Sequence, residues 1–328
     1  MGAFGVQAQY SDQKRTPDLR VKKGPANSKR VPLIPRFIPG QTFRYEMEFE
    51  TRTDTRRSGL AKDPQGPTSL VVNWNATVRM DVLPADAATP GGIRLRTTYE
   101  KSAATVTTDS FDPAATETAN QYKNLEGKVV EITLDADRKV KSVAGLEGMV
   151  DTQQASQSAH DWISQLSASA GAPTGGVTVG QSWSSDQPAD TLPIAGLVWR
   201  TDSTYLRNEP CHPVNAEIPQ SAGASDATTL APTELECAVI LANLSLVHGK
   251  GSHSETSADL RNDGVQSAGK WEGSGQSLLY VSLATGMVVS VTQTGSEQMD
   301  VTLTSNRDTS MHYAGTITSR SQVALVAN

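Results

Sequence analysis

The sequence predicts an all-β fold, with curved antiparallel sheets in two similar halves and one amphipathic helix between them. Apolar and polar residues alternate with a period of two over long stretches, which is the pattern of strands that have one solvated face. Only 5% of the 328 residues are aromatic, whereas Thr, Ser, Val, Gly and Ala are frequent, as in many antiparallel sheets. Along the chain we expect a signal remnant and disordered basic arm at 1–36, a β half at 37–148, a linking helix at 149–171 and a second β half at 172–328.

The N-terminal arm is expected to lie outside the folded part. Val6-Gln7-Ala8 has the small-x-small form of a signal-peptidase site, which predicts a mature chain that begins at Gln9 outside the cytoplasm. Residues 10–36 carry eight Lys or Arg against two Asp and few apolar residues, so they cannot bury enough surface to offset the entropy of ordering. The arm is then either a spacer or a segment that contacts an anionic surface such as phospholipid headgroups.

The N-terminal half begins with three alternating runs. Apolar residues occupy the odd positions of 43–49 and the even positions of 70–82, and a third run at 93–99 follows turn residues at 89–92. A further hairpin is predicted at 130–143. The run at 70–82 is long for a strand, which favours a curved sheet.

One helix is predicted, between Met149 and Ala170. Apolar residues recur on one face at intervals of three or four, which is the spacing of an amphipathic helix. They are Ala155, Ala159, Trp162, Ile163, Leu166 and Ala170. We expect this face to pack against the apolar side of the sheet. There it either closes a ligand cavity, whose wall would contain Trp162, Ile163, Leu166 and Trp74, or completes the core.

The C-terminal half returns to short alternating runs. Strands are predicted at 197–206, 235–248, 279–283, 287–291, 299–303 and 323–326. The segment from Pro39 to Phe43 is similar to that from Val179 to Trp183, and residues 132–143 are similar to 281–291. These likenesses indicate either a duplicated half of about 140 residues or the ordinary similarity of short hairpins.

Cys211 and Cys237 are predicted to form a disulfide, because a segment rich in Pro, Ser and Thr separates them and no other thiol competes. Such a bridge indicates an extracytoplasmic protein, either secreted, periplasmic or at the cell surface. The alternatives are two free thiols in a cytosolic protein, or a zinc site that includes His212, although the spacing matches no zinc module.

The run from Pro173 to Trp183, Pro-Thr-Gly-Gly-Val-Thr-Val-Gly-Gln-Ser-Trp, resembles a pattern found in an uncharacterised bacterial family of secreted or lipid-anchored β-rich envelope proteins. In that family the run follows the single helix, and a strand like that from Pro39 to Phe43 opens the domain. The resemblance implies an envelope location and no assigned activity. The sequence departs from the lipid-anchored members in that no lipobox cysteine lies near its start, so the resemblance leaves anchoring open.

The sequence carries no recognisable catalytic motif. None of the 5 histidines lies in a metal or nucleophile signature, and Ser182 lacks the final Gly of a nucleophile elbow. We therefore expect no cofactor and no metal, and the net charge of −6 argues against a nucleic-acid partner. The leading hypothesis is a non-enzymatic extracytoplasmic binding or scaffold protein whose partner is a hydrophobic ligand or an envelope protein. The alternative is a secreted hydrolase with scattered catalytic residues, which a His beside Ser and Asp would favour.

Truncation of Trp162 tests the role of the predicted helix. Three small residues on its apolar stripe, Ala155, Ala159 and Ala170, indicate close packing, so the stripe is expected to complete the core. Trp162→Ala should then lower the free energy of unfolding, measured by denaturant titration, by about 3–5 kcal/mol and leave ligand retention unchanged. A loss below about 1 kcal/mol with altered ligand retention would instead identify this stripe as the wall of a cavity.

Overall fold

The computed structural model describes residues 30–59, 68–84, 90–109, 119–135, 140–145, 172–173, 175–189, 192–211, 236–249, 256–306 and 309–326. They contain the strands β1 (Thr42–Gly59), β2 (Thr68–Leu83), β3 (Ile93–Thr108), β4 (Val129–Leu134), β5 (Val140–Ala144), β6 (Ser182–Pro188), β7 (Leu197–Pro210), β8 (Glu236–His248), β9 (Val265–Ser282), β10 (Val288–Ser305) and β11 (Ser310–Val326), with a short helix, α3 (Ala258–Asn262), before β9.

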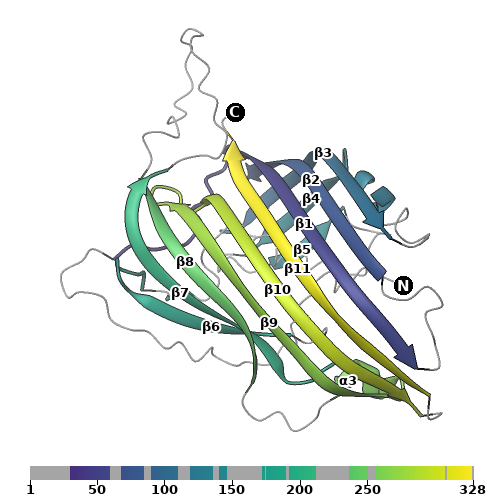
Figure 1. Cartoon of the computed structure of the whole chain (residues 1–328). Helices are drawn as coiled ribbons and strands as arrows, with labels where there is room; N and C mark the ends of the chain where they lie inside the picture. Colours follow the sequence, from purple (N-terminus) through teal and green to yellow (C-terminus); the bar gives the residue numbers. More distant parts are fainter. Residues whose placement is uncertain are drawn as a thin grey trace.

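These strands form one antiparallel sheet of 11 strands, in the order β5-β4-β3-β2-β1-β11-β10-β9-β8-β7-β6 (Figure 1). Strands β1 to β5 follow one another across one part of the sheet, and β6 to β10 across the other. The predicted all-β fold is confirmed. The two predicted halves, however, belong to one continuous sheet, because β11 pairs with both β1 and β10 along nearly its full length.

The sheet has one apolar and one solvated face, as the alternating sequence predicts. On β2, Met80 and Val82 are buried, whereas Arg79 on the opposite face is exposed. We call the face with the buried side chains the inner face and the other the outer face. Ion pairs such as Arg96 with Glu131, at 2.6 Å, join neighbouring strands on the outer face.

Two hydrophobic cores lie on the inner face, at opposite ends of the long strands. The main core is at the end where β1 begins and β11 ends, and it takes side chains from β1 to β4 and from β6 to β11. Its largest fully buried side chains include Trp183, Tyr45, Tyr205, Met80, Leu95 and Ile132. The second core, at the far end of β7 to β10, is built on Ala189, Ile194, Leu197 and Val301.

Residues 30–41, which we call the strap, cross the end of the sheet beside the main core. Their backbone hydrogen bonds reach three separate parts of the sheet: Val31 with Val177 before β6 (2.8 and 2.9 Å), Arg36 with Thr285 between β9 and β10 (2.7 Å), and Gly40 with Val82 on β2 (2.8 Å). The strap therefore connects strands that lie far apart in the sheet order.

The strap has its own apolar side. Leu33 and Phe37 are 2% and 7% exposed and belong to the main core, whereas Ile34 and Ile38 face outwards. Residues 30–36 are thus ordered, contrary to the expectation that the disordered arm extends to residue 36. The physical reason is the period-two pattern of apolar residues, which gives this short segment a face to bury.

The two similar sequence segments fold into equivalent turns. Gly40 and Gly180 both have positive φ angles, 90° and 80°, which glycine adopts without strain. In each turn the amide oxygen of the next residue, Gln41 or Gln181, accepts a hydrogen bond from the backbone N–H three residues earlier, at 3.2 and 3.1 Å. This equivalence supports the predicted duplication, which stays a prediction.

The predicted helix at 149–171 and the arm residues 1–29 lie outside the described residues, so both stay predictions. Within the described part, helical residues are found at 119–123 and in α3. No helix in this part of the chain is long and apolar enough to span a membrane.

Loss of the Phe37 ring tests the strap. Phe37→Ala should lower the free energy of unfolding by about 3–5 kcal/mol, because it leaves a cavity in the main core. Ile38→Ala is the matched control, since Ile38 is 57% exposed, and it should change stability by less than about 0.5 kcal/mol. The free energies of unfolding of both variants are measured by urea titration. If Phe37→Ala is as stable as Ile38→Ala, the strap does not contribute to the core.

Candidate functional site

Between the two cores, the strand register places a row of mostly small residues across the inner face. The residues that face one another in this row are Leu244, Gly275, Gly295, Ser319, Thr51 and Val72, from β8, β9, β10, β11, β1 and β2. The next row towards the second core contains Gly273, Glu297, Ile317, Thr53 and Leu70. We call these two rows together the middle band.

The middle band is less completely buried than either core. All its residues are half-buried except Val72, which is buried. On the outer face of the same strands, Ser274, Ser296 and Thr318 are exposed. The band is therefore more accessible to solvent than either core, and less accessible than the outer face of the same strands.

Trp199 of β7 borders the band by lying against the backbone of Gly273. A Cβ atom at Gly273 would lie 2.5 Å from Cη2 of Trp199, so any side chain there would displace the indole. Trp199 and Trp271 both pack against the second core. The glycine thus lets one of two tryptophans reach the edge of the band.

Glu297 is the ionisable residue of the middle band. Its Oε2 accepts a hydrogen bond from Nε1 of Trp271 at 2.8 Å. Burial raises the pKa of Glu297 above its ordinary value, and the hydrogen bond from Trp271 offsets part of this increase. No charged group of the described residues contributes to the shift. The carboxylate therefore lacks a compensating cation in this part of the chain.

Trp74, the described member of the predicted ligand face, lies on the inner face beside the main core. Its Nε1 donates a hydrogen bond to Oγ of Ser102 at 2.9 Å, and its ring centroid lies 5.5 Å from that of Tyr122. These contacts indicate a packed position. The other members of that face, Trp162, Ile163 and Leu166, lie outside the described residues.

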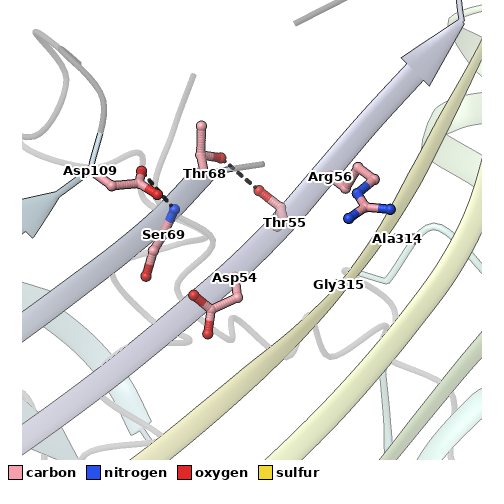
Figure 2. Close-up of a pocket in the computed structure, with 8 residues that line it drawn as sticks. All are labelled: Asp54, Thr55, Arg56, Thr68, Ser69, Asp109, Ala314 and Gly315. Carbon is pink, nitrogen blue, oxygen red and sulfur yellow. Dashed lines mark hydrogen bonds between the residues drawn. The ribbon is translucent and has the colours of Figure 1, made fainter. Parts of the chain in front are cut away.

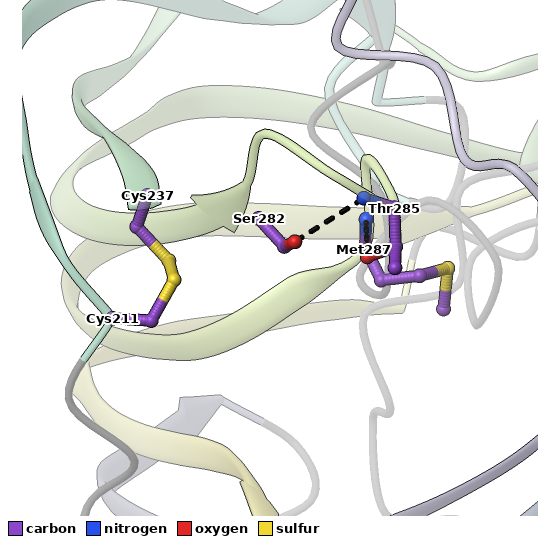
Figure 3. The surroundings of a disulfide bond; sticks show 5 residues. All are labelled: Cys211, Cys237, Ser282, Thr285 and Met287. Carbon is purple, nitrogen blue, oxygen red and sulfur yellow. Dashed lines mark hydrogen bonds between the residues drawn. A yellow bond between two sulfur atoms is a disulfide. The ribbon is translucent and has the colours of Figure 1, made fainter. Parts of the chain in front are cut away.

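The predicted disulfide is confirmed: Cys211 and Cys237 are bonded, with their Cα atoms 5.0 Å apart (Figure 3). The bond ties the end of β7 to the start of β8, and both cysteines are buried. Close by, Oγ of Ser282 accepts the N–H of Thr285 at 3.2 Å, in the turn that also binds the strap. The zinc alternative is wrong, because neither cysteine is free.

A hollow of about 340 Å³ lies at the far end of β1, β2 and β11, away from the main core (Figure 2). It is lined by Asp54, Thr55, Arg56, Thr68, Ser69, Asp109, Ala314 and Gly315. Nε of Arg52 donates a hydrogen bond to Oδ2 of Asp54 at 2.7 Å, and this contact lowers the pKa of Asp54. Oδ1 of Asp109 accepts a hydrogen bond from the backbone N–H of Ser69 at 2.9 Å. Both carboxylates are thus held by neighbouring groups, and the described residues contain no cluster of His, Cys, Asp and Glu that could hold a metal.

The outer face carries a Ser, His and Asp side by side, near this hollow. Nε2 of His312 lies 2.8 Å from Oδ1 of Asp300, and Nδ1 lies 3.4 Å from Oγ of Ser58. In a catalytic triad the carboxylate is buried and fixes the histidine. Here the Asp300 side chain is 71% exposed, so water competes for these contacts and the histidine is not activated in that way.

The sequence did not predict Glu297 as a site residue, and for Trp199 and Trp271 it favours core positions over a binding platform. The sequence does contain a local signal for Glu297. The odd-numbered residues of β10 lie on the same face as the core residue Val291, and Glu297 is the charged residue among them. Residues 292–298, however, fall between two shorter predicted strands. Only the cross-strand register brings Glu297 opposite Gly273 and next to the indoles.

No protein-family model matches the chain, and no curated protein matches it. Among solved structures, it is similar to lipovitellin, in a structure of its lipid–protein interactions, with 8% identity, a TM-score of 0.41, and coverage of 89% of this chain and 25% of that chain. It is also similar to DynF from the dynemicin biosynthesis pathway of Micromonospora chersina, with 8% identity, a TM-score of 0.16, and coverage of 98% of this chain and 92% of that chain. A third similar structure is an outer membrane channel from Pseudomonas putida F1, with 6% identity, a TM-score of 0.18, and coverage of 93% of this chain and 100% of that chain. TM-scores this low carry no functional argument.

Removal of the disulfide should destabilise the protein. The cysteines are 26 residues apart, and a loop of this size corresponds to about 3 kcal/mol of unfolding free energy. Equilibrium denaturation of the Cys211→Ala, Cys237→Ala double variant measures this loss. Thiol titration of the unfolded, unreduced wild type should detect no free sulfhydryl, and finding two would contradict the bond.

Proposed function

We propose that this chain is a non-enzymatic binding protein that holds a small apolar or amphipathic molecule on the middle band. The observation that supports this is the row Leu244, Gly275, Gly295, Ser319 and Thr51, which is half-buried between two cores and has glycine, serine or threonine at every position except Leu244. A ligand that covers this row would remove apolar surface from water, which is the main driving force for binding such molecules.

The composition of the band favours a binding surface over a solid scaffold. A closely packed domain fills its centre with large aliphatic side chains, yet β9 and β10 present Gly275 and Gly295 there. Leu70 and Ile317, in the adjoining row, supply half-buried apolar contacts for an elongated molecule. Such a molecule could lie across the strands, parallel to the rows.

An extracytoplasmic location is part of the proposal. The disulfide supports it, because disulfides persist mainly in oxidising compartments. Cleavage after Ala8, contact of the basic arm with an anionic surface, and an envelope protein as partner also stay proposals, since they depend on residues 1–29 or on partners outside this chain.

The arrangement of Ser58, His312 and Asp300 is the observation that favours the alternative of a secreted hydrolase. We do not adopt it, because the exposed Asp300 cannot hold and polarise His312 as a buried carboxylate does. The middle band, in contrast, combines half-buried apolar side chains with a carboxylate that no charged group of the described residues compensates, and these are features of a binding site.

Filling the band tests the proposal. The apolar fluorophore N-phenyl-1-naphthylamine should bind the wild-type chain, and dodecanol should displace it. Ser319→Leu places a large side chain in the central row and should weaken fluorophore binding at least about tenfold. Thr318→Leu, on the exposed outer face of the same strand, is the matched control and should bind like wild type.

The fold of each variant is checked by circular dichroism. If Ser319→Leu does not fold, Thr51→Leu in the same row replaces it, with Arg52→Leu on the outer face as its control. Wild-type protein that fails to bind the fluorophore, or folded band variants that bind it unchanged, would refute the proposed function.

A further inference from the structure

We propose that Glu297, Trp199 and Trp271 form the polar end of the site on the middle band, and that the ligand is an amphiphile with a cationic ammonium head. This inference rests on the proposed function and specifies the chemical class of its ligand. It comes from the placement of one carboxylate beside two indoles, in a band whose other residues are uncharged.

Three strands bring these side chains together. Glu297 on β10 faces Gly273 on β9, and the Trp199 ring from β7 lies on that glycine. Trp271, two residues before Gly273, donates its Nε1–H to Oε2 of Glu297 at 2.8 Å. The Glu297 carboxylate therefore accepts a hydrogen bond from the Trp271 indole, and the Trp199 indole covers Gly273, the residue opposite Glu297.

The described residues around Glu297 provide no positive charge. Its inner-face neighbours are Gly273 and Trp271 on β9, Gly295 and Met299 on β10, and Ile317 and Ser319 on β11. None of them ionises, and Trp199 from β7 does not either. The indole N–H is a neutral donor to one of the two carboxylate oxygens, so the other oxygen is left for a ligand.

A cationic head satisfies this environment better than a neutral or anionic one. Partial burial of a carboxylate without a counter-ion is unfavourable, as the raised pKa of Glu297 reflects. An ammonium group within about 4–6 Å would compensate the charge, and the faces of tryptophans attract such groups, quaternary ammonium in particular. An alkyl chain attached to the head would then extend along the small side chains of the central row.

Competition against bound N-phenyl-1-naphthylamine tests the inference on the full chain. Three probes with the same alkyl chain are compared at pH 7.5: dodecyltrimethylammonium, dodecanol and dodecanoate. The cationic probe should displace the fluorophore at a concentration at least about tenfold lower than dodecanol, and dodecanoate should be the weakest. Glu297→Gln should abolish the advantage of the cation and leave dodecanol unchanged, whereas Glu272→Gln, on the exposed face of β9, should behave like wild type.

The pH dependence gives a second readout. Dodecyltrimethylammonium keeps its charge at every pH, so only the protein titrates. As the pH falls through the raised pKa of Glu297, the carboxylate takes up a proton and the preference for the cation should disappear in the wild type. Glu297→Gln should show no preference at any pH.

The outcomes separate the two proposals. Displacement by dodecanol without any preference for the cation, or a preference that survives in Glu297→Gln, would overturn the head-group inference and leave the apolar site intact. Failure of all three probes to displace the fluorophore would overturn both. Stronger binding of dodecanoate than of the cation would reverse the assigned charge.

Discussion

The structure depends on one constraint: the apolar face of a single antiparallel sheet must be kept from water. The described residues form no second sheet that could cover this face. The main core solves this at one end, where side chains from ten strands meet and the strap crosses the sheet. The second core solves it at the other end of β7 to β10, where Ala189, Leu192 and Ile194 pack on the strands. The middle band is what these two solutions leave between them, and its position follows from the sheet and not from any local motif.

The alternation of apolar and polar residues is enough to predict β1 and β2 and their inner face, because a strand with one solvated face has no other periodicity. It predicts β9 to β11 only as short runs, because Gly, Ser and Thr interrupt the apolar residues on their inner face. The disulfide follows from cysteine count and context. The strap could not be separated from the arm, because its apolar residues alternate with prolines and arginines that are typical of disordered segments. The surroundings of Glu297 could not be predicted either, since they come from strands far apart in the sequence whose register is fixed only in the folded sheet.

Charge is distributed differently over the two faces. On the outer face, carboxylates such as Glu131 and Asp186 pair with arginines of neighbouring strands in contact with water, where each pair contributes little to stability. On the inner face, Glu297 is partly buried, and among the described residues its hydrogen-bond partner is a neutral indole. A carboxylate placed at such a cost to stability has a clear physical use if a bound molecule supplies the missing charge.

The central claim is that the middle band binds an apolar chain with a cationic head, and photo-crosslinking tests it most directly. The probe is a dodecylamine that carries a diazirine in its alkyl chain, and labelled residues are mapped by mass spectrometry. The account predicts labels on Leu244, Ile317 or Leu70, which an excess of dodecyltrimethylammonium suppresses. Labels confined to outer-face residues such as Thr318, or labels on the band that the competitor does not suppress, would contradict it.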